Sequence, residues 1–176
     1  MAHELDLSRV GAELKKIRLR RNPFPSDILN IEKILASTGL FKKTEIDVAK
    51  EVFQDYLGEG DESLYYFIFA DMGEELAGYV CYGPITIAEG RFDLYWIAVE
   101  EKARGKGIGG LLLREAERHM QSMKCEYVYI ETSSREEYEP TRRFYRKYGY
   151  KEVARVPKFF GAEDDKLVYM KAMKSV

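Results

Sequence analysis

The feature that most constrains this chain is a glycine-rich turn between a strand-like run and an amphipathic run. The turn reads Arg104-Gly105-Lys106-Gly107-Ile108-Gly109-Gly110, and the strand-like run before it is Phe92 to Val99. Glycines let the backbone come close to a ligand, and a helix that begins inside such a turn directs unpaired N–H groups at it. Because the helix start carries a partial positive charge, the turn predicts a binding loop for an anion, and for phosphate in particular.

Length and composition exclude several classes of protein. A chain of 176 residues suits one compact domain, and 45% hydrophobic with 33% charged residues indicates neither disorder nor a membrane protein. No apolar run approaches the ~18 residues of a membrane span, and the N-terminus has no signal-peptide pattern. The net charge of −2 makes no case for nucleic acid. We therefore expect a cytoplasmic protein that binds neither nucleic acid nor membrane.

Cysteines, histidines and one basic run carry little functional signal. Cys81 and Cys125 lie in strand-like runs, where small buried thiols are expected rather than a disulfide. His3 and His119 are far apart, nothing has metal-ligand spacing, and we expect no metal. The basic run from Lys15 to Arg21 predicts an edge strand with a solvated face, with a polyanion site as the alternative.

Hydrophobic periodicity predicts a mixed order of elements. Residues 1–13 are expected to be a lead-in and residues 14–176 one domain. The expected strands are Leu14–Arg20, Leu64–Ala70, Leu76–Tyr82, Phe92–Val99, Cys125–Glu131, Lys151–Val156 and Lys166–Met173. The second and third should form an antiparallel hairpin. The strands on either side of the helix after the glycine turn should be parallel.

Capping residues suggest where the other helices begin and end. Ser26 can cap a first helix. Thr44 with Asp47 resembles a capping box for a second helix, which Gly58 would end. A last helix spans about Glu139 to Tyr148, with Pro140 in its first turn and Gly149 just past its end.

The glycine spacing alone admits a second interpretation. Gly105-x-Gly107-x-x-Gly110, with Glu131 about twenty residues on, matches a dinucleotide-binding fingerprint. An antiparallel hairpin before the turn, and only 66 residues after Gly110, disfavour it. A dinucleotide-binding oxidoreductase stays a minor alternative. No Gly-Lys-Ser/Thr ends the turn, which excludes a Walker loop.

The better interpretation joins the turn to a later helix that carries Phe144-Tyr145-Arg146-Lys147-Tyr148-Gly149-Tyr150. The order of elements resembles that of the GNAT superfamily of acyl-CoA N-acyltransferases, over residues 14 to 173. That order is a hairpin, a strand, Arg-x-x-Gly-x-Gly, a helix, a strand and this helix. The resemblance implies an α/β (α+β) fold. It would be a single domain whose mixed, mostly antiparallel sheet has about six or seven strands and a splayed parallel pair, flanked by about four helices.

The resemblance also implies how acetyl-CoA would be held. The pyrophosphate would lie on the loop of Arg104, Gly105, Lys106, Gly107, Ile108, Gly109 and Gly110. The pantetheine amides would pair with the strand edge of Ile97, Ala98 and Val99. The Ile97 amide is the candidate for polarising the thioester carbonyl.

Three side chains are candidates for proton transfer. The resemblance implies that Tyr145 protonates the departing thiolate; the alternative is an aromatic packed in the core. Asp93 is the first candidate base, since it falls where some family members carry a catalytic glutamate; a strand-start carboxylate facing solvent is as reasonable. Glu131 is the second candidate, with a structural or substrate-orienting role as its alternative.

The acceptor is less constrained than the donor. We expect a pocket lined by Gly39, Leu40 and Phe41 and by Phe159 and Phe160. Tyr138 stands where many family members place an asparagine, so that contact does not carry over. The expected function is transfer of an acetyl group to a primary amine of a small molecule or peptide N-terminus, by a monomer or homodimer. A non-catalytic acyl-CoA-binding module is the alternative.

Overall fold

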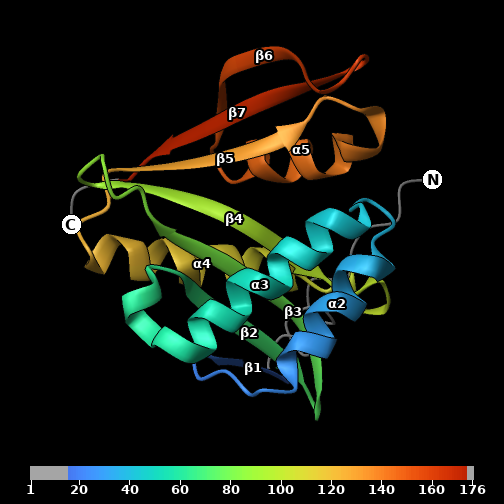
Figure 1. The fold of residues 1–176 in the computed structure, drawn as a ribbon, viewed down its shortest axis with the longest axis vertical. Helices are drawn as coiled ribbons and strands as arrows, with labels where there is room; N and C mark the ends of the chain where they lie inside the picture. The colour runs from blue at the N-terminus through green and yellow to red at the C-terminus, as the bar shows by residue number, and fades with distance from the viewer. Residues whose placement is uncertain (1–15, 174–176) are drawn as a thin grey trace. The chain divides into compact units, whose positions relative to one another are not determined.

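The computed structural model describes residues 16–173, apart from the side chain of Asp61. Within them lie four α-helices and a seven-stranded sheet with the order β1-β2-β3-β4-β5-β7-β6 (Figure 1). The strands are β1 (Ile17–Arg20), β2 (Tyr66–Met72), β3 (Glu75–Pro84), β4 (Arg91–Val99), β5 (Tyr127–Ser133), β6 (Lys151–Gly161) and β7 (Asp164–Ala172). The helices are α2 (Asp27–Ser37), α3 (Lys43–Glu59), α4 (Ile108–Ser122) and α5 (Glu139–Lys147). One strand pair, β4–β5, is parallel, which confirms the predicted fold class. The expected lead-in, residues 1–13, lies outside the described residues.

The described chain falls into two compact units. Unit 1 runs to Cys81 and resumes over Trp96–Glu115, whereas unit 2 comprises Tyr82–Tyr95 and residues 116–173. The glycine turn belongs to unit 1, and the helix that carries Tyr145 belongs to unit 2.

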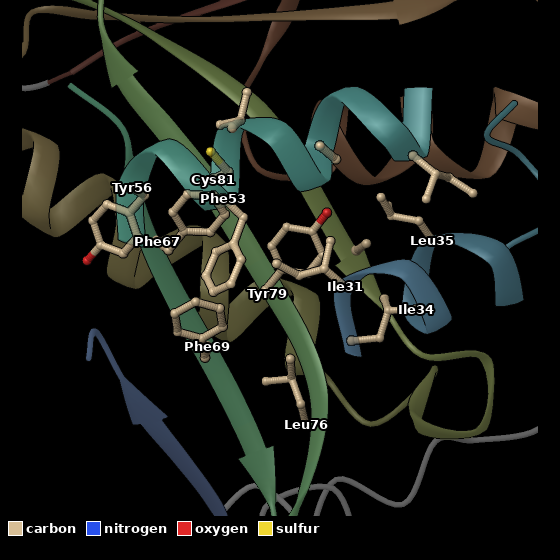
Figure 2. Close-up of a cluster of buried hydrophobic side chains, with 14 residues drawn as sticks. Ile31, Ile34, Leu35, Phe53, Tyr56, Phe67, Phe69, Leu76, Tyr79 and Cys81 are labelled. Atoms are coloured by element: carbon tan, nitrogen blue, oxygen red, sulfur yellow. The ribbon is translucent and has the colours of Figure 1, made fainter. Parts of the chain in front are cut away.

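The core of unit 1 is aromatic. Phe53 from α3 meets the Phe67 ring of β2 edge-on at 5.4 Å, and Phe67 stacks on Phe69 at 5.8 Å. Figure 2 shows these rings and Tyr79 of β3 facing the aliphatic side chains of α2. Those aliphatic residues recur at helical spacing, which is why α2 buries one face: Ile31, Ile34 and Leu35. This core fixes β3 and the end of β4, to which Trp96 and Ala98 belong.

The helix starts correct the predicted caps. Ser26 makes no side-chain cap bond; instead the carboxylate of Asp27 accepts the Phe24 N–H at 2.8 Å. The α3 helix begins at Lys43, and the Glu45 carboxylate accepts the Lys42 N–H at 2.8 Å, so the Thr44–Asp47 box is wrong. The helix also passes Gly58 and ends at Glu59, where Gly60 has φ +59°. In each case another carboxylate accepts the N–H: Asp27, one residue after Ser26, and Glu45, two residues before Asp47.

The basic run forms an edge strand, as predicted, but its face is not solvated at Arg20. The Arg20 side chain is 11% exposed and lies between the rings of Phe24 and Phe69, each 4.4 Å away. Its guanidinium donates to both oxygens of Asp27 at 2.8 Å and to Asp71 at 2.9 Å. One cation thus joins β1, β2 and the start of α2. Lys15, where this run begins, lies outside the described residues.

Unit 2 packs α5 against an antiparallel ladder of β5, β7 and β6 (Figure 1, orange to red). Glu117 of α4 is buried and accepts from the Tyr150 hydroxyl at 3.0 Å and from Lys171 of β7 at 2.8 Å. The β6 strand runs past its predicted end at Val156 to Gly161, so Phe159 and Phe160 lie on the strand itself. Pro140 lies in the first turn of α5 and Gly149 follows the helix with φ +89°, as predicted.

The remaining expectations concern cysteines and membrane spans. Cys81 and Cys125 are both buried and free, as predicted. Burial raises the pKa of Cys125 to about 11 and that of Cys81 well above its usual value, so both stay thiols at neutral pH. Among residues 16–173, no helix is both long and apolar enough to cross a bilayer.

Arg20 provides a test of this account of unit 1. Replacing it by methionine leaves the buried Asp27 without its cation and Asp71 with Arg18 alone, and should lower the free energy of unfolding by about 3–5 kcal/mol. Arg18 is the matched control, because it also pairs with Asp71, at 3.1 Å, but its side chain is 72% exposed. Arg18→Met should lower stability by at most about 1 kcal/mol. Equal losses for the two variants in urea denaturation would contradict the role given to Arg20.

Candidate active site

The glycine turn has the backbone that its sequence predicts. Gly105 and Gly107 have φ of +77° and +83°, values that side chains with a Cβ rarely adopt. A Cβ built on Gly105 would meet no atom within 4 Å, so this glycine faces open space rather than a packed neighbour. The α4 helix begins directly after the turn, where the Leu111 N–H donates to the Gly107 carbonyl at 3.1 Å.

The donors of this turn are unused. The N–H groups of residues 105–110 find no acceptor within residues 16–173. The Lys106 ammonium lies 3.9 Å from the Met72 sulfur and forms no ion pair with any described residue. Unpaired N–H groups, a helix start and a spare cation together can bind a doubly charged anion.

The end of β4 presents a free edge. The Glu100 N–H donates to Ala77 of β3 at 2.8 Å, and a Cβ on Gly78 would lie 2.8 Å from the Ala98 carbonyl oxygen. Because backbone groups alternate along a strand, Ala98 and Glu100 face β3, while Ile97 and Val99 face away from it. Of the predicted edge residues, Ile97 and Val99 can therefore receive an extended ligand, and the backbone of Ala98 is turned to β3.

The parallel ladder of β4 and β5 is short. It pairs Arg91 with Tyr127, Phe92 with Val128 and Asp93 with Tyr129. Beyond Asp93 no further β4–β5 pair is present in the described chain. The splay that the family resemblance implies thus begins at Asp93.

Asp93 and Glu131 share one face of unit 2. They alternate with buried neighbours on β4 and β5, and Glu131 lies two residues beyond Tyr129, the partner of Asp93. Burial chiefly, and then the Glu131 charge, raise the pKa of half-buried Asp93, while Lys166 opposes them. The Lys166 ammonium lies 3.1 Å from Glu131 and 4.0 Å from the centroid of the Phe159 ring. The structure thus joins both candidate bases to one of the predicted acceptor residues.

Tyr145 is buried on α5 among other aromatic rings. Its ring centroid lies 5.7 Å from that of Phe144, 6.1 Å from Tyr150 and 6.2 Å from Tyr169. No described residue hydrogen-bonds to its hydroxyl. Burial raises its pKa, so the hydroxyl keeps its proton at neutral pH and can donate it.

The predicted acceptor residues lie in different units. In unit 1, Gly39 has φ +68° and Phe41 packs on the aromatic core. The Leu40 N–H donates to the Thr38 hydroxyl at 3.1 Å. In unit 2, Phe159 and Phe160 are 54% and 40% exposed and meet edge to face at 4.9 Å.

Sequence reasoning missed two residues beside these groups. Lys166 was expected only as the start of a strand, yet it faces Glu131. Arg142 is buried on α5 three residues before Tyr145. A basic residue on the apolar side of a short helix is a sequence signal for such a buried cation, and Arg142 follows the pattern. Within residues 16–173, no group of three or more His, Cys, Asp or Glu is placed to hold a metal ion.

Comparisons with known proteins agree with this arrangement. The model of the acetyltransferase (GNAT) family matches residues 28–150. A GNAT-family protein from Desulfovibrio desulfuricans is 37% identical, with a TM-score of 0.87 over 90% of this chain and 99% of that one. The PaiA N-acetyltransferase of Thermoplasma acidophilum, solved with coenzyme A, shares the fold at 17% identity, with a TM-score of 0.69 over 89% of this chain and 98% of that one.

A curated relative is more distant. An uncharacterized N-acetyltransferase of Methanocaldococcus jannaschii is 28% identical over 106 residues, which span 60% of this chain and 65% of that relative. The family match favours the acyl-CoA interpretation of the glycine turn over the dinucleotide one. Since the family model covers most of its length, the chain belongs to the GNAT family of acetyltransferases.

Proposed function

We propose that this protein transfers an acetyl group from acetyl-CoA to a primary amine of a small molecule or a peptide N-terminus, by direct attack in a ternary complex. The observation that carries the proposal is the glycine turn, whose N–H groups at residues 105–110 have no acceptor in the described chain. Acetyl-CoA supplies the acetyl group as a thioester, and the residues below bind and activate it.

The donor side follows from backbone groups. The N–H groups of the turn and the Lys106 charge would hold the pyrophosphate, with Arg104 beside them. Ile97 and Val99 would pair with the pantetheine amides, because their backbone faces away from β3. The Ile97 N–H would stabilise negative charge on the thioester oxygen. Coenzyme A in the PaiA structure supports this class of ligand.

The reaction needs two proton transfers, one from the attacking amine and one to the departing thiolate. Free amines are mostly protonated at neutral pH, so a base has to remove a proton. Asp93 is the preferred base since its raised pKa brings it closer to neutrality, and Glu131 is the second candidate. Tyr145 would donate its proton to the departing thiolate, because its hydroxyl is protonated and has no hydrogen-bond partner among residues 16–173.

The acceptor is proposed only as a class of compound, a primary amine of a small molecule or of a peptide N-terminus. The proposed contacts of the acceptor amine are Gly39, Leu40 and Phe41 in unit 1, and Phe159 and Phe160 in unit 2. The two free, buried cysteines are compatible with the reducing cytoplasm. A non-catalytic acyl-CoA-binding module on the same fold would share the donor contacts and lack turnover.

One experiment separates these functions. Thermal-shift measurements with acetyl-CoA and with NAD test the donor, and only acetyl-CoA should raise the melting temperature. Release of free thiol is then followed with phenethylamine, putrescine or a lysine-free tetrapeptide as acceptor. Binding with turnover supports the transferase; binding without turnover supports the module; stabilisation by NAD alone would overturn both.

The donor loop makes its own prediction. Gly107→Ala forces a Cβ into φ +83° and should weaken acetyl-CoA binding on the order of tenfold. Gly58→Ala is the matched control, because Gly58 lies inside α3 and a Cβ there meets nothing within 4 Å. Calorimetry with acetyl-CoA measures both dissociation constants. Unchanged affinity in Gly107→Ala would remove the loop from the donor site.

Tyr145 is tested through turnover. Tyr145→Phe removes the hydroxyl and keeps the buried ring, so turnover should fall about 100-fold. The dissociation constant of acetyl-CoA should change little, because the hydroxyl acts on the leaving group. Tyr148→Phe, just past the end of the same helix, is the control and should retain wild-type turnover. Wild-type turnover in Tyr145→Phe would rule out the general acid.

The pH profile tests Asp93. A base acts only after it loses its proton, so kcat/KM should rise with pH through the pKa of Asp93. Glu131→Gln removes a charge that raises this pKa, and the rise should move to lower pH. Lys166→Met removes a charge that lowers it, and the rise should move to higher pH. Shifts in the same direction, or none, would contradict Asp93 as the base.

A further inference from the structure

Arg142 is a buried cation that the proposed chemistry does not use. It lies on α5, and its side chain is 10% exposed. One guanidinium nitrogen, Nη1, donates to the Ser133 carbonyl at 2.7 Å and to the Arg135 carbonyl at 2.8 Å. Its Nε donates to Glu139 at 3.0 Å, which balances the buried charge. Arg142 therefore binds the main chain at the end of β5 from the first turns of α5.

The Ser133 carbonyl is an acceptor that the sheet leaves open. The Ser134 N–H donates to Asp165 of β7 at 2.9 Å. Because backbone groups alternate, the Ser133 carbonyl points away from β7, to the side of β5 on which β4 pairs at Tyr129. The β4–β5 ladder has ended before this point. Arg142 thus satisfies a carbonyl that a longer ladder would otherwise occupy.

The segment that Arg142 binds is itself held to β7 by hydrogen bonds. The Ser133 hydroxyl bonds to Asp164 at 2.5 Å and accepts the Arg135 N–H at 3.1 Å. The Ser134 hydroxyl accepts the Asp165 N–H at 2.8 Å. These bonds fix the turn after β5 to the start of β7, so a helix anchored to this turn is anchored to the sheet.

The anchor and Tyr145 share the buried face of α5. They are three residues apart, a spacing that puts two side chains on neighbouring turns of one helical face, and both are buried. The Nε bond to Glu139 orients the guanidinium on α5 and its Nη1 binds two carbonyls beyond it, so together these bonds limit the rotation of the helix as well as its distance from β5. The rotation of α5 in turn decides where the Tyr145 hydroxyl points.

We propose that Arg142 is a positioning residue for acetyl transfer: by binding the Ser133 and Arg135 carbonyls it holds α5 against the end of β5, and so sets the place of the Tyr145 hydroxyl relative to Glu131. The role rests on the function proposed above. A lysine at this position would supply a single ammonium in place of the planar fork, and an apolar residue would leave both carbonyls without this donor.

The test compares two neighbouring arginines of α5. Arg142→Ala should lower kcat on the order of 100-fold and leave the KM for acetyl-CoA within about twofold. Arg142→Lys should fall between this variant and the wild type. Arg143→Ala is the control, because Arg143 is 70% exposed and lies 3.7 Å from the same Glu139; its kcat should match the wild type. The acceptor is whichever of phenethylamine, putrescine and the tetrapeptide the wild type acetylates.

Chemical rescue separates positioning from loss of stability. Guanidinium ion, below the concentration that unfolds the protein, should restore part of the kcat of Arg142→Ala and none of that of Tyr145→Phe. Wild-type kcat in Arg142→Ala would overturn the proposal. If Arg142→Ala does not fold, Arg142→Lys decides: reduced kcat at unchanged KM supports the role, and wild-type kcat overturns it.

Hydrogen exchange makes the two proposals separately falsifiable. Amides of residues 134–149 should exchange faster in Arg142→Ala than in the wild type, and at the wild-type rate in Arg143→Ala. If the wild type acetylates no amine, acetyl transfer fails, whereas faster exchange still supports the anchoring of α5. Equal exchange in both variants overturns the anchoring.

Discussion

The β4–β5 ladder, which stops at Asp93 and Tyr129, is the constraint on which the candidate site depends. A parallel pair that ends early leaves strand-edge N–H and C=O groups to find other partners. On β5 the structure provides one, since Arg142 binds the Ser133 carbonyl at 2.7 Å. On β4 the backbone of Ile97 and Val99 faces away from β3, and the proposed contact with the pantetheine amides rests on this edge. On β5 the end of the ladder creates a demand for an internal cation, which Arg142 meets.

Buried charge is used in the same way in each unit. In unit 1, Arg20 binds Asp27 and Asp71 and ties an edge strand to a helix. In unit 2, Glu117 accepts from Tyr150 and Lys171. Each of these groups bonds to elements far apart in sequence, and breaking one would leave a buried charge uncompensated.

The family resemblance implied the fold class, and the order of elements could be predicted because hydrophobic period and turn residues act locally. Pro140 in the first turn and Gly149 just past the end of the last helix were predicted, as the structure confirms. The predictions that were wrong or missing concern residues whose partners are distant in the sequence. Ser26 does not cap the helix; Asp27 accepts the Phe24 N–H instead, and its carboxylate also binds Arg20 of β1. Lys166 meets Glu131 only once β5 and β7 pair, so its part in the site could not be read from either strand. Roles that depend on strand pairing cannot be predicted from local sequence patterns.

The two carboxylates of unit 2 are chemically unequal although they share a face. Glu131 is half exposed and pairs with the Lys166 ammonium at 3.1 Å. Asp93 is half-buried, and it is the group whose pKa rises, in part because Glu131 is charged. A site that separates two carboxyl groups in this way assigns them different tasks. In the proposed transfer, the ion-paired Glu131 would orient the ammonium, and Asp93, whose pKa is raised, would accept the proton. Phe159 contributes to this arrangement, since its ring contacts the Lys166 ammonium that pairs with Glu131.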